Sequence, residues 1–135
     1  MRILADRNIP FAVEVFSQFG HVRLASGREI TPEMVREAEI LVVRSVTRVD
    51  SALLEGSPVR FVGTATIGTD HIDLRYLKER GIAFADAAGS NATSVAEYVT
   101  AALLYVEQRD GISFEGKTLG VVGVGNVGSR VVRKG

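Results

Sequence analysis

A glycine-rich segment near the end of the 135-residue chain has the spacing G-x-G-x-x-G, which could hold the phosphates of a dinucleotide. It follows an apolar run at residues 118–122 that we predict as a strand, and it opens a predicted helix. In that context the first glycine permits a tight turn, the second lets the backbone approach a pyrophosphate, and the third allows close helix packing. A glycine-rich turn without a ligand is the alternative. The residues that would bind the cofactor are Gly123, Gly125, Asn126, Val127 and Gly128.

Two further segments carry groups that could bind an anion, and each follows a predicted strand. Arg44 and Ser45 come directly after the strand at 40–43, and Thr66 lies in a loop after the strand at 60–63. A guanidinium offers paired donors to a carboxylate or a phosphate, and open α/β sheets bind ligands outside the carboxyl ends of their strands. The sequence therefore predicts an anion pocket at this edge, with turns capped by Ser and Thr side chains as the alternative.

The histidines and the absence of cysteine limit the catalytic and metal-binding groups that the chain can offer. His71 stands beside Asp70 and Asp73 at a predicted helix start, where polar clusters usually cap the helix, so we interpret it as a structural or surface residue rather than a general base. His21 has no such neighbours. Because the chain has no cysteine and its two histidines are isolated, the sequence offers no disulfide, no thiolate nucleophile and only a weak case for a metal site.

Composition indicates a globular protein of about one domain, with 46% hydrophobic and 24% charged residues. The 16 basic residues balance the 16 acidic residues along the whole chain, so the basic footprint of a nucleic-acid-binding protein is missing. The apolar runs are far shorter than the roughly 20 residues that a membrane-spanning helix needs. We therefore expect a cytoplasmic protein that binds neither nucleic acid nor membrane.

Apolar spacing predicts alternating strands and helices, which is typical of a parallel α/β sheet. The predicted strands cover residues 2–5, 21–25, 40–43, 60–63, 82–85 and 118–122. The predicted helices cover residues 10–19, 32–38, 51–54, 74–80 and 93–109, and the last carries an apolar stripe wide enough to suggest burial on more than one side. Because a single strand–helix unit after residue 116 would leave a parallel strand uncovered, we expect the chain to be part of a longer protein or to pair with another chain.

Four segments together resemble the D-isomer-specific 2-hydroxyacid dehydrogenases: residues 44–47, 63–73, 91–98 and 116–123. The resemblance implies a flavodoxin-like substrate-binding domain over residues 1–93. It also implies that residues 94–135 contain an interdomain helix and the truncated start of a Rossmann NAD-binding domain.

The chemistry implied by this resemblance is hydride transfer between NAD and the hydroxyl-bearing carbon of a phosphorylated hydroxy acid. Ser45 and Thr66 would contact the substrate, whereas the family's catalytic Arg, Glu and His are expected beyond Gly135. The most similar family member would be a cytoplasmic homodimer that oxidises 4-phospho-D-erythronate on the way to pyridoxal phosphate. D-3-phosphoglycerate dehydrogenase and a non-catalytic α/β anion-binding module remain alternatives. The acidic residue that distinguishes NAD from NADP would lie about 20 residues after the glycines.

Overall fold

The computed structural model describes all residues from Met1 to Gly135 and divides them into two compact units, Met1–Ala87 and Ala88–Gly135. The division falls ahead of the boundary expected at residue 93. The loop before the long helix belongs to the second unit, because a Cβ built on Gly89 would lie 3.0 Å from the Asn126 side chain. Each unit is described by itself below.

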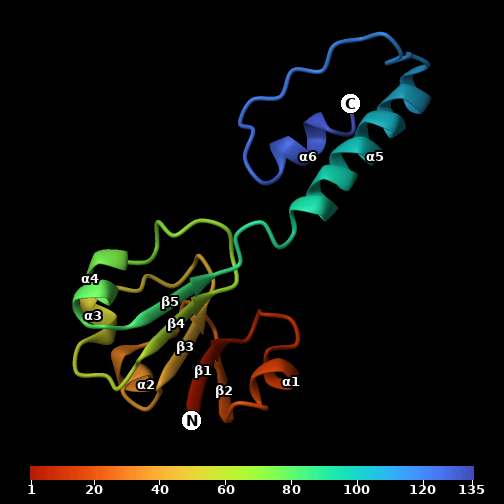
Figure 1. Ribbon diagram of the computed structural model, residues 1–135. Helices are drawn as coiled ribbons and strands as arrows, with labels where there is room; N and C mark the ends of the chain where they lie inside the picture. The colour runs from red at the N-terminus through yellow and green to blue at the C-terminus, as the bar shows by residue number, and fades with distance from the viewer. The chain divides into compact units, whose positions relative to one another are not determined.

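The first unit is built on a five-stranded parallel sheet with the strand order β2-β1-β3-β4-β5 (Figure 1). The strands are β1 (Arg2–Asp6), β2 (His21–Ala25), β3 (Ile40–Val43), β4 (Phe61–Thr64) and β5 (Ala83–Asp86). This order is that of flavodoxin-like folds, in which the chain changes direction across the sheet between β1 and β3. The predicted flavodoxin-like fold and all five strands of this unit are therefore confirmed, to within one residue at each end.

Helices cover both faces of this sheet, but unequally (Figure 1). The helices are α1 (Ala12–Phe16), α2 (Pro32–Val35), α3 (Ser51–Leu54) and α4 (Leu74–Glu79). Successive side chains of a strand point to opposite faces, so Leu4 joins the core under α2, α3 and α4, while Ile3 and Ala5 pack with α1. The larger core therefore lies on the side of three helices.

Three helices begin at side chains that accept a backbone N–H. Thr31 caps α2 and precedes a proline at the first helical position, while Asp50 caps α3 and Asp73 caps α4 with a 2.9 Å bond from the Tyr76 N–H. The predicted helix over 10–19 is shorter than expected: it ends at Phe16, and the chain then turns so that the His21 N–H reaches the Met1 carbonyl.

The predicted helix over residues 10–19 includes Phe11, but Phe11 precedes α1. It has φ 59° and its side chain is largely exposed. A left-handed backbone is uncommon for a bulky residue. The turn that brings the chain from β1 into α1 therefore places Phe11 on the surface.

The second unit consists of the long helix α5 (Ala92–Asp110), the short helix α6 (Gly128–Val132) and the irregular segment between them (Figure 1). The predicted strand at 118–122 is wrong: these residues are not in a strand, and Val122 is fully exposed. A strand needs a neighbour to complete its backbone hydrogen bonds, and the second unit contains no other strand.

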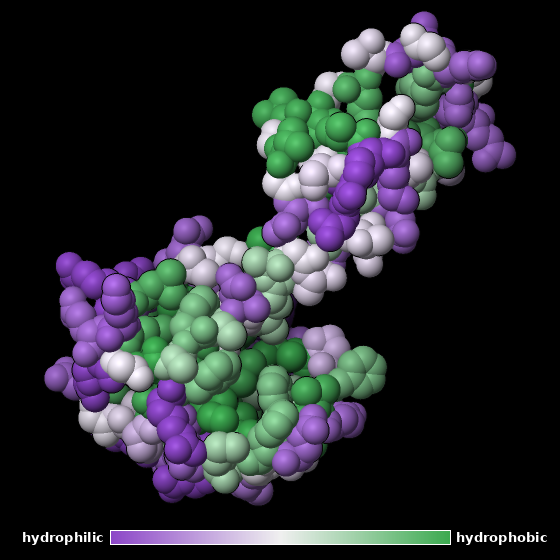
Figure 2. All heavy atoms as spheres, in the orientation of Figure 1, coloured by the Kyte–Doolittle hydropathy of each residue, from purple (hydrophilic) through white to green (hydrophobic).

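The apolar stripe of α5 is also less buried than predicted. Only Ala92 and Ala96 are buried in this helix, while Tyr98 is 74% exposed and Tyr105 62%. Figure 2 shows apolar side chains gathered on the surface of this unit. Nevertheless, none of the helices, α5 included, is both long enough and apolar enough to cross a membrane.

Candidate functional site

The Arg44–Thr47 loop leaves the carboxyl end of β3 as a closed turn. The Thr47 N–H donates to the Arg44 carbonyl over 3.1 Å, and the buried Thr47 hydroxyl donates to the Gly27 carbonyl over 2.7 Å. These bonds hold the loop against the segment that follows β2. Arg44 is half-buried and Ser45 is exposed, so these two side chains remain accessible at this edge.

The loop that follows β4 runs beside this turn, because β3 and β4 are neighbours with Val43 opposite Thr64. The Ala65 N–H donates to the Val43 carbonyl over 2.9 Å. Farther along, the Val49 N–H donates to the His71 carbonyl over 2.8 Å, in an isolated bridge that joins the two loops. The loops bearing Arg44, Ser45 and Thr66 therefore start from adjacent strand ends and are tied together.

A chain of three polar side chains runs from the end of β4 into the loop that follows it. The Thr64 hydroxyl is 3.1 Å from the Thr66 hydroxyl and 3.1 Å from His71 Nε2. Burial lowers the pKa of His71 below its ordinary value, and the Asp70 carboxylate opposes that shift in part. The His71 ring is thus hydrogen-bonded to a threonine at the end of β4, and its interpretation as a structural or surface residue stays a prediction.

Two buried groups at this edge of the sheet were not predicted from the sequence. Thr64 is 4% exposed and joins Thr66 to His71, and Asp6, fully buried at the end of β1, accepts from the Asn8 N–H and amide through Oδ1. Its Oδ2 is buried without a partner. A Cβ built on Gly27 would lie 2.5 Å from that oxygen. The position of Asp6 directly after a buried strand was the signal that could have identified it.

The glycine segment adopts the conformations that its spacing suggests, although no strand precedes it. Gly123 has φ 88°, in the left-handed region that favours glycine, and a Cβ on Gly128 would overlap the Gly123 carbonyl. Gly125 faces open space. The predicted helix start is confirmed at Gly128, where α6 begins, and the Arg130 guanidinium donates to the Asn126 carbonyl. The backbone at Gly125 is therefore open to a ligand.

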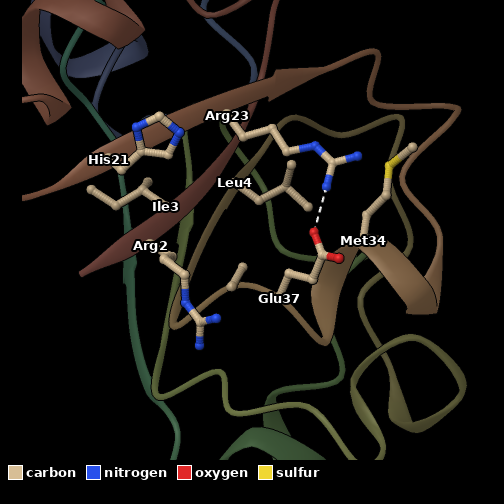
Figure 3. Close-up of a pocket in the computed structure, with 8 residues that line it drawn as sticks. Arg2, Ile3, Leu4, His21, Arg23, Met34 and Glu37 are labelled. Carbon is tan, nitrogen blue, oxygen red and sulfur yellow. Dashed lines mark hydrogen bonds and ion pairs between the residues drawn. The ribbon is translucent and has the colours of Figure 1, made fainter.

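A hollow of about 300 Å³ lies away from the predicted site residues, beside the first residues of β1 and β2 (Figure 3). In Figure 3 the Arg23 guanidinium donates to the Glu37 carboxylate over 2.7 Å, and His21 and Arg2 line the same hollow. No group of three or more His, Asp or Glu side chains in the chain is arranged to hold a metal ion. The predicted site residues Arg44, Ser45 and Thr66 follow the opposite, carboxyl ends of β3 and β4.

Residues 3–128 match the family described as D-isomer specific 2-hydroxyacid dehydrogenase, catalytic domain. The parallel sheet and the loops at its carboxyl edge agree with that match, which covers nearly the whole chain. The chain therefore belongs to the D-isomer specific 2-hydroxyacid dehydrogenase family.

Among curated relatives, the chain is 59% identical to erythronate-4-phosphate dehydrogenase of Chromohalobacter salexigens, over 99% of this chain and 35% of the relative. It is 56% identical to the enzyme of the same name from Salinibacter ruber, over 99% of this chain and 34% of the relative. The chain thus spans about a third of the length of the relatives that it matches.

Solved structures share the fold at lower identity. A D-lactate dehydrogenase from Aquifex aeolicus, complexed with NAD and lactic acid, has a TM-score of 0.70 at 21% identity, and the match covers 99% of this chain and 47% of that one. The NAD-bound 3-phosphoglycerate dehydrogenase of Entamoeba histolytica has a TM-score of 0.70 at 23% identity, covering 99% and 50%. These structures support the fold.

Proposed function

We propose that the complete protein oxidises 4-phospho-D-erythronate to 2-oxo-3-hydroxy-4-phosphobutanoate with NAD, as a step toward pyridoxal phosphate. The observation that carries this proposal is the 59% identity to an erythronate-4-phosphate dehydrogenase across 99% of this chain. A homodimer in the cytoplasm belongs to the same proposal. Within it, residues 1–93 form the substrate-binding domain, and residues 94–135 begin the NAD-binding domain.

The two loops at the carboxyl edge of the sheet would bind the substrate. Arg44 would pair its guanidinium with the phosphate or the carboxylate, because a planar fork of donors matches either group. Ser45 and Thr66 would donate hydroxyl hydrogen bonds to the same anion. The bonds from Thr47 to the backbone at Arg44 and Gly27 support this assignment, since they fix the turn before a substrate arrives.

The glycine segment would hold the pyrophosphate of NAD. The open space around Gly125 and the left-handed backbone of Gly123 fit a close approach of phosphate to the main chain. NAD, when bound, supplies the acceptor for the hydride that leaves the substrate carbon. We assign no catalytic acid or base to these 135 residues and place the catalytic Arg, Glu and His beyond Gly135.

Steady-state kinetics of the complete protein test the proposal. Purified enzyme is mixed with NAD and either 4-phospho-D-erythronate or 3-phospho-D-glycerate, and formation of NADH is followed by absorbance. We expect a higher kcat/KM for 4-phospho-D-erythronate, and a loss of about tenfold in that value for Ser45→Ala, which removes one hydrogen bond to a charged group. Preference for 3-phospho-D-glycerate would reject the proposed substrate, and turnover of neither acid would reject the proposed reaction.

A further inference from the structure

The Thr66 hydroxyl belongs to a linear chain of hydrogen bonds rather than acting alone. It lies 3.1 Å from the Thr64 hydroxyl, which lies 3.1 Å from His71 Nε2. A hydroxyl has one proton, so Thr64 can donate to only one of these two neighbours. The group at one end of the chain therefore determines the direction of both bonds.

The two directions leave Thr66 with opposite properties toward an anion. When Nε2 of His71 has no proton, Thr64 donates to the ring and Thr66 donates to Thr64, so that Thr66 presents only lone pairs outward. When Nε2 carries a proton, the ring donates to Thr64 and Thr64 donates to Thr66. The proton of Thr66 is then free to donate to a carboxylate or a phosphate.

The backbone holds the histidine end of this chain in place. The Val49 N–H donates to the His71 carbonyl, and the Asp73 N–H donates to the Val49 carbonyl, each over 2.8 Å. These two bonds fix the backbone of His71, from which the ring reaches the Thr64 hydroxyl. Thr64 is itself buried at the end of β4, so that the relay has a fixed geometry.

Three of the four charged groups around the ring have partners of their own. A hollow beside His71 is lined by Arg48, Asp50, Asp70 and Asp73. Arg48 is paired with Asp50 over 2.9 Å, and Asp73 caps α4. Burial favours the neutral ring, since it lowers the pKa of His71. At neutral pH the tautomer of His71 therefore decides the direction of the relay.

We propose that His71 is a positioning residue for the substrate: acting through Thr64, it donates from Nε2 and thereby turns the Thr66 proton toward an anionic group of the substrate. This inference rests on the proposed function, in which Thr66 contacts the phosphorylated hydroxy acid. In this role His71 sets the direction in which the Thr66 hydroxyl donates, which neither Ser45 nor Thr66 can do alone.

Two pairs of variants of the complete enzyme test the relay. His71→Leu and Thr64→Val break it, while His71→Gln keeps an amide N–H near the position of Nε2 and Thr64→Ser keeps the hydroxyl. We expect the two breaking variants to raise the KM for 4-phospho-D-erythronate about tenfold, as for a lost hydrogen bond to a charged group. The two conservative variants should stay within about threefold of the wild type, with the KM for NAD unchanged in all four.

His21→Gln is the matched control, because it changes the chain's other histidine at an exposed position of β2. Thr64→Val decides the test if His71→Leu unfolds, since valine has the shape of threonine and suits a strand. An unchanged substrate KM in Thr64→Val would overturn the relay, as would a His71→Gln enzyme as impaired as His71→Leu. A wild-type enzyme that does not oxidise 4-phospho-D-erythronate would instead reject the proposed function itself.

Discussion

A buried hydrogen bond from the Thr47 hydroxyl to the Gly27 carbonyl supports the first of the proposed substrate loops. The Thr47 hydroxyl, the Asp6 carboxylate and the backbone of Gly27 converge at the carboxyl ends of β1 and β3, where a Cβ on Gly27 would approach both side chains. None of these three groups is proposed to touch the substrate. They set the backbone from which Arg44 and Ser45 extend.

Replacement of Thr47 by valine tests this support. The change keeps the side-chain volume but leaves the buried Gly27 carbonyl without its donor, and an unsatisfied buried group costs about 1–3 kcal/mol. We expect the free energy of unfolding of the 135-residue chain in urea to fall by that amount. Thr47→Ser, which keeps the hydroxyl, should lose less. No loss in Thr47→Val together with a loss in Thr47→Ser would show that packing of the methyl group, and not the hydrogen bond, stabilises the loop.

Titration of His71 gives the stability a dependence on pH. Its pKa is lowered in the folded chain by burial, so the unfolded chain takes up this proton more readily. The stabilising contribution is present above the pKa of the unfolded histidine and is lost as the pH falls from there through the lower folded pKa. We expect unfolding midpoints measured at a series of acidic pH values to fall less steeply in His71→Gln. A steeper fall in His71→Gln would contradict the sign of the shift.

At the scale of elements, short helices depend on their caps. α4 has only six residues, and its start is held by the Asp73 carboxylate, which accepts the Tyr76 N–H. The residue before the helix is thus as important as any inside it, because a helix this short has few internal bonds. α2 and α3, still shorter, begin in the same way at Thr31 and Asp50.

Asp73→Ala should therefore destabilise the first unit by about 1 kcal/mol, the usual cost of losing an N-cap. Asp73→Ser retains an acceptor oxygen and should recover most of that loss. Thermal unfolding followed by circular dichroism measures both variants under the same conditions. If alanine and serine proved equally stable, the capping bond at Asp73 would contribute nothing measurable.

The success of sequence-based prediction differs between these elements for physical reasons. Ile40–Val43 is an uninterrupted apolar run, so its assignment to a buried strand depended on local sequence alone. Residues 118–122 have a similar pattern but no neighbouring strand within the second unit, and pairing cannot be judged locally. The contact between Thr64 and His71 was missed for the same reason, because it depends on a bridge to Val49 in another loop.

At the scale of the whole molecule, the sequence of 135 residues folds into two units whose stabilities have separate sources. The first unit contains every strand and both hydrophobic clusters. In the second, α5 keeps large apolar side chains exposed, and Gly128 and Val131 are the buried residues of α6. A change in the glycine segment should accordingly leave the sheet intact.

Replacement of Gly125 by valine in the complete protein tests this independence together with the proposed cofactor site. A branched side chain would fill the open space at that residue, and we expect NAD binding measured by calorimetry to be lost, since the backbone could no longer approach the pyrophosphate. Circular dichroism should show an unchanged fold. Gly120→Val, at another glycine that faces open space, is the control. Retained NAD affinity would make the glycine segment structural only.

The strand order has a consequence for how the chain assembles during its synthesis. β1 emerges from the ribosome first and lies inside the finished sheet, with β2 on one side and β3 on the other. β2 adds to one edge of β1, and β3, β4 and β5 then add in turn to the other, so that every new strand meets a free edge. No strand has to be inserted between two that are already paired. The sheet can therefore grow outward in the order of translation, which spares it the rearrangements that expose unpaired edges to aggregation.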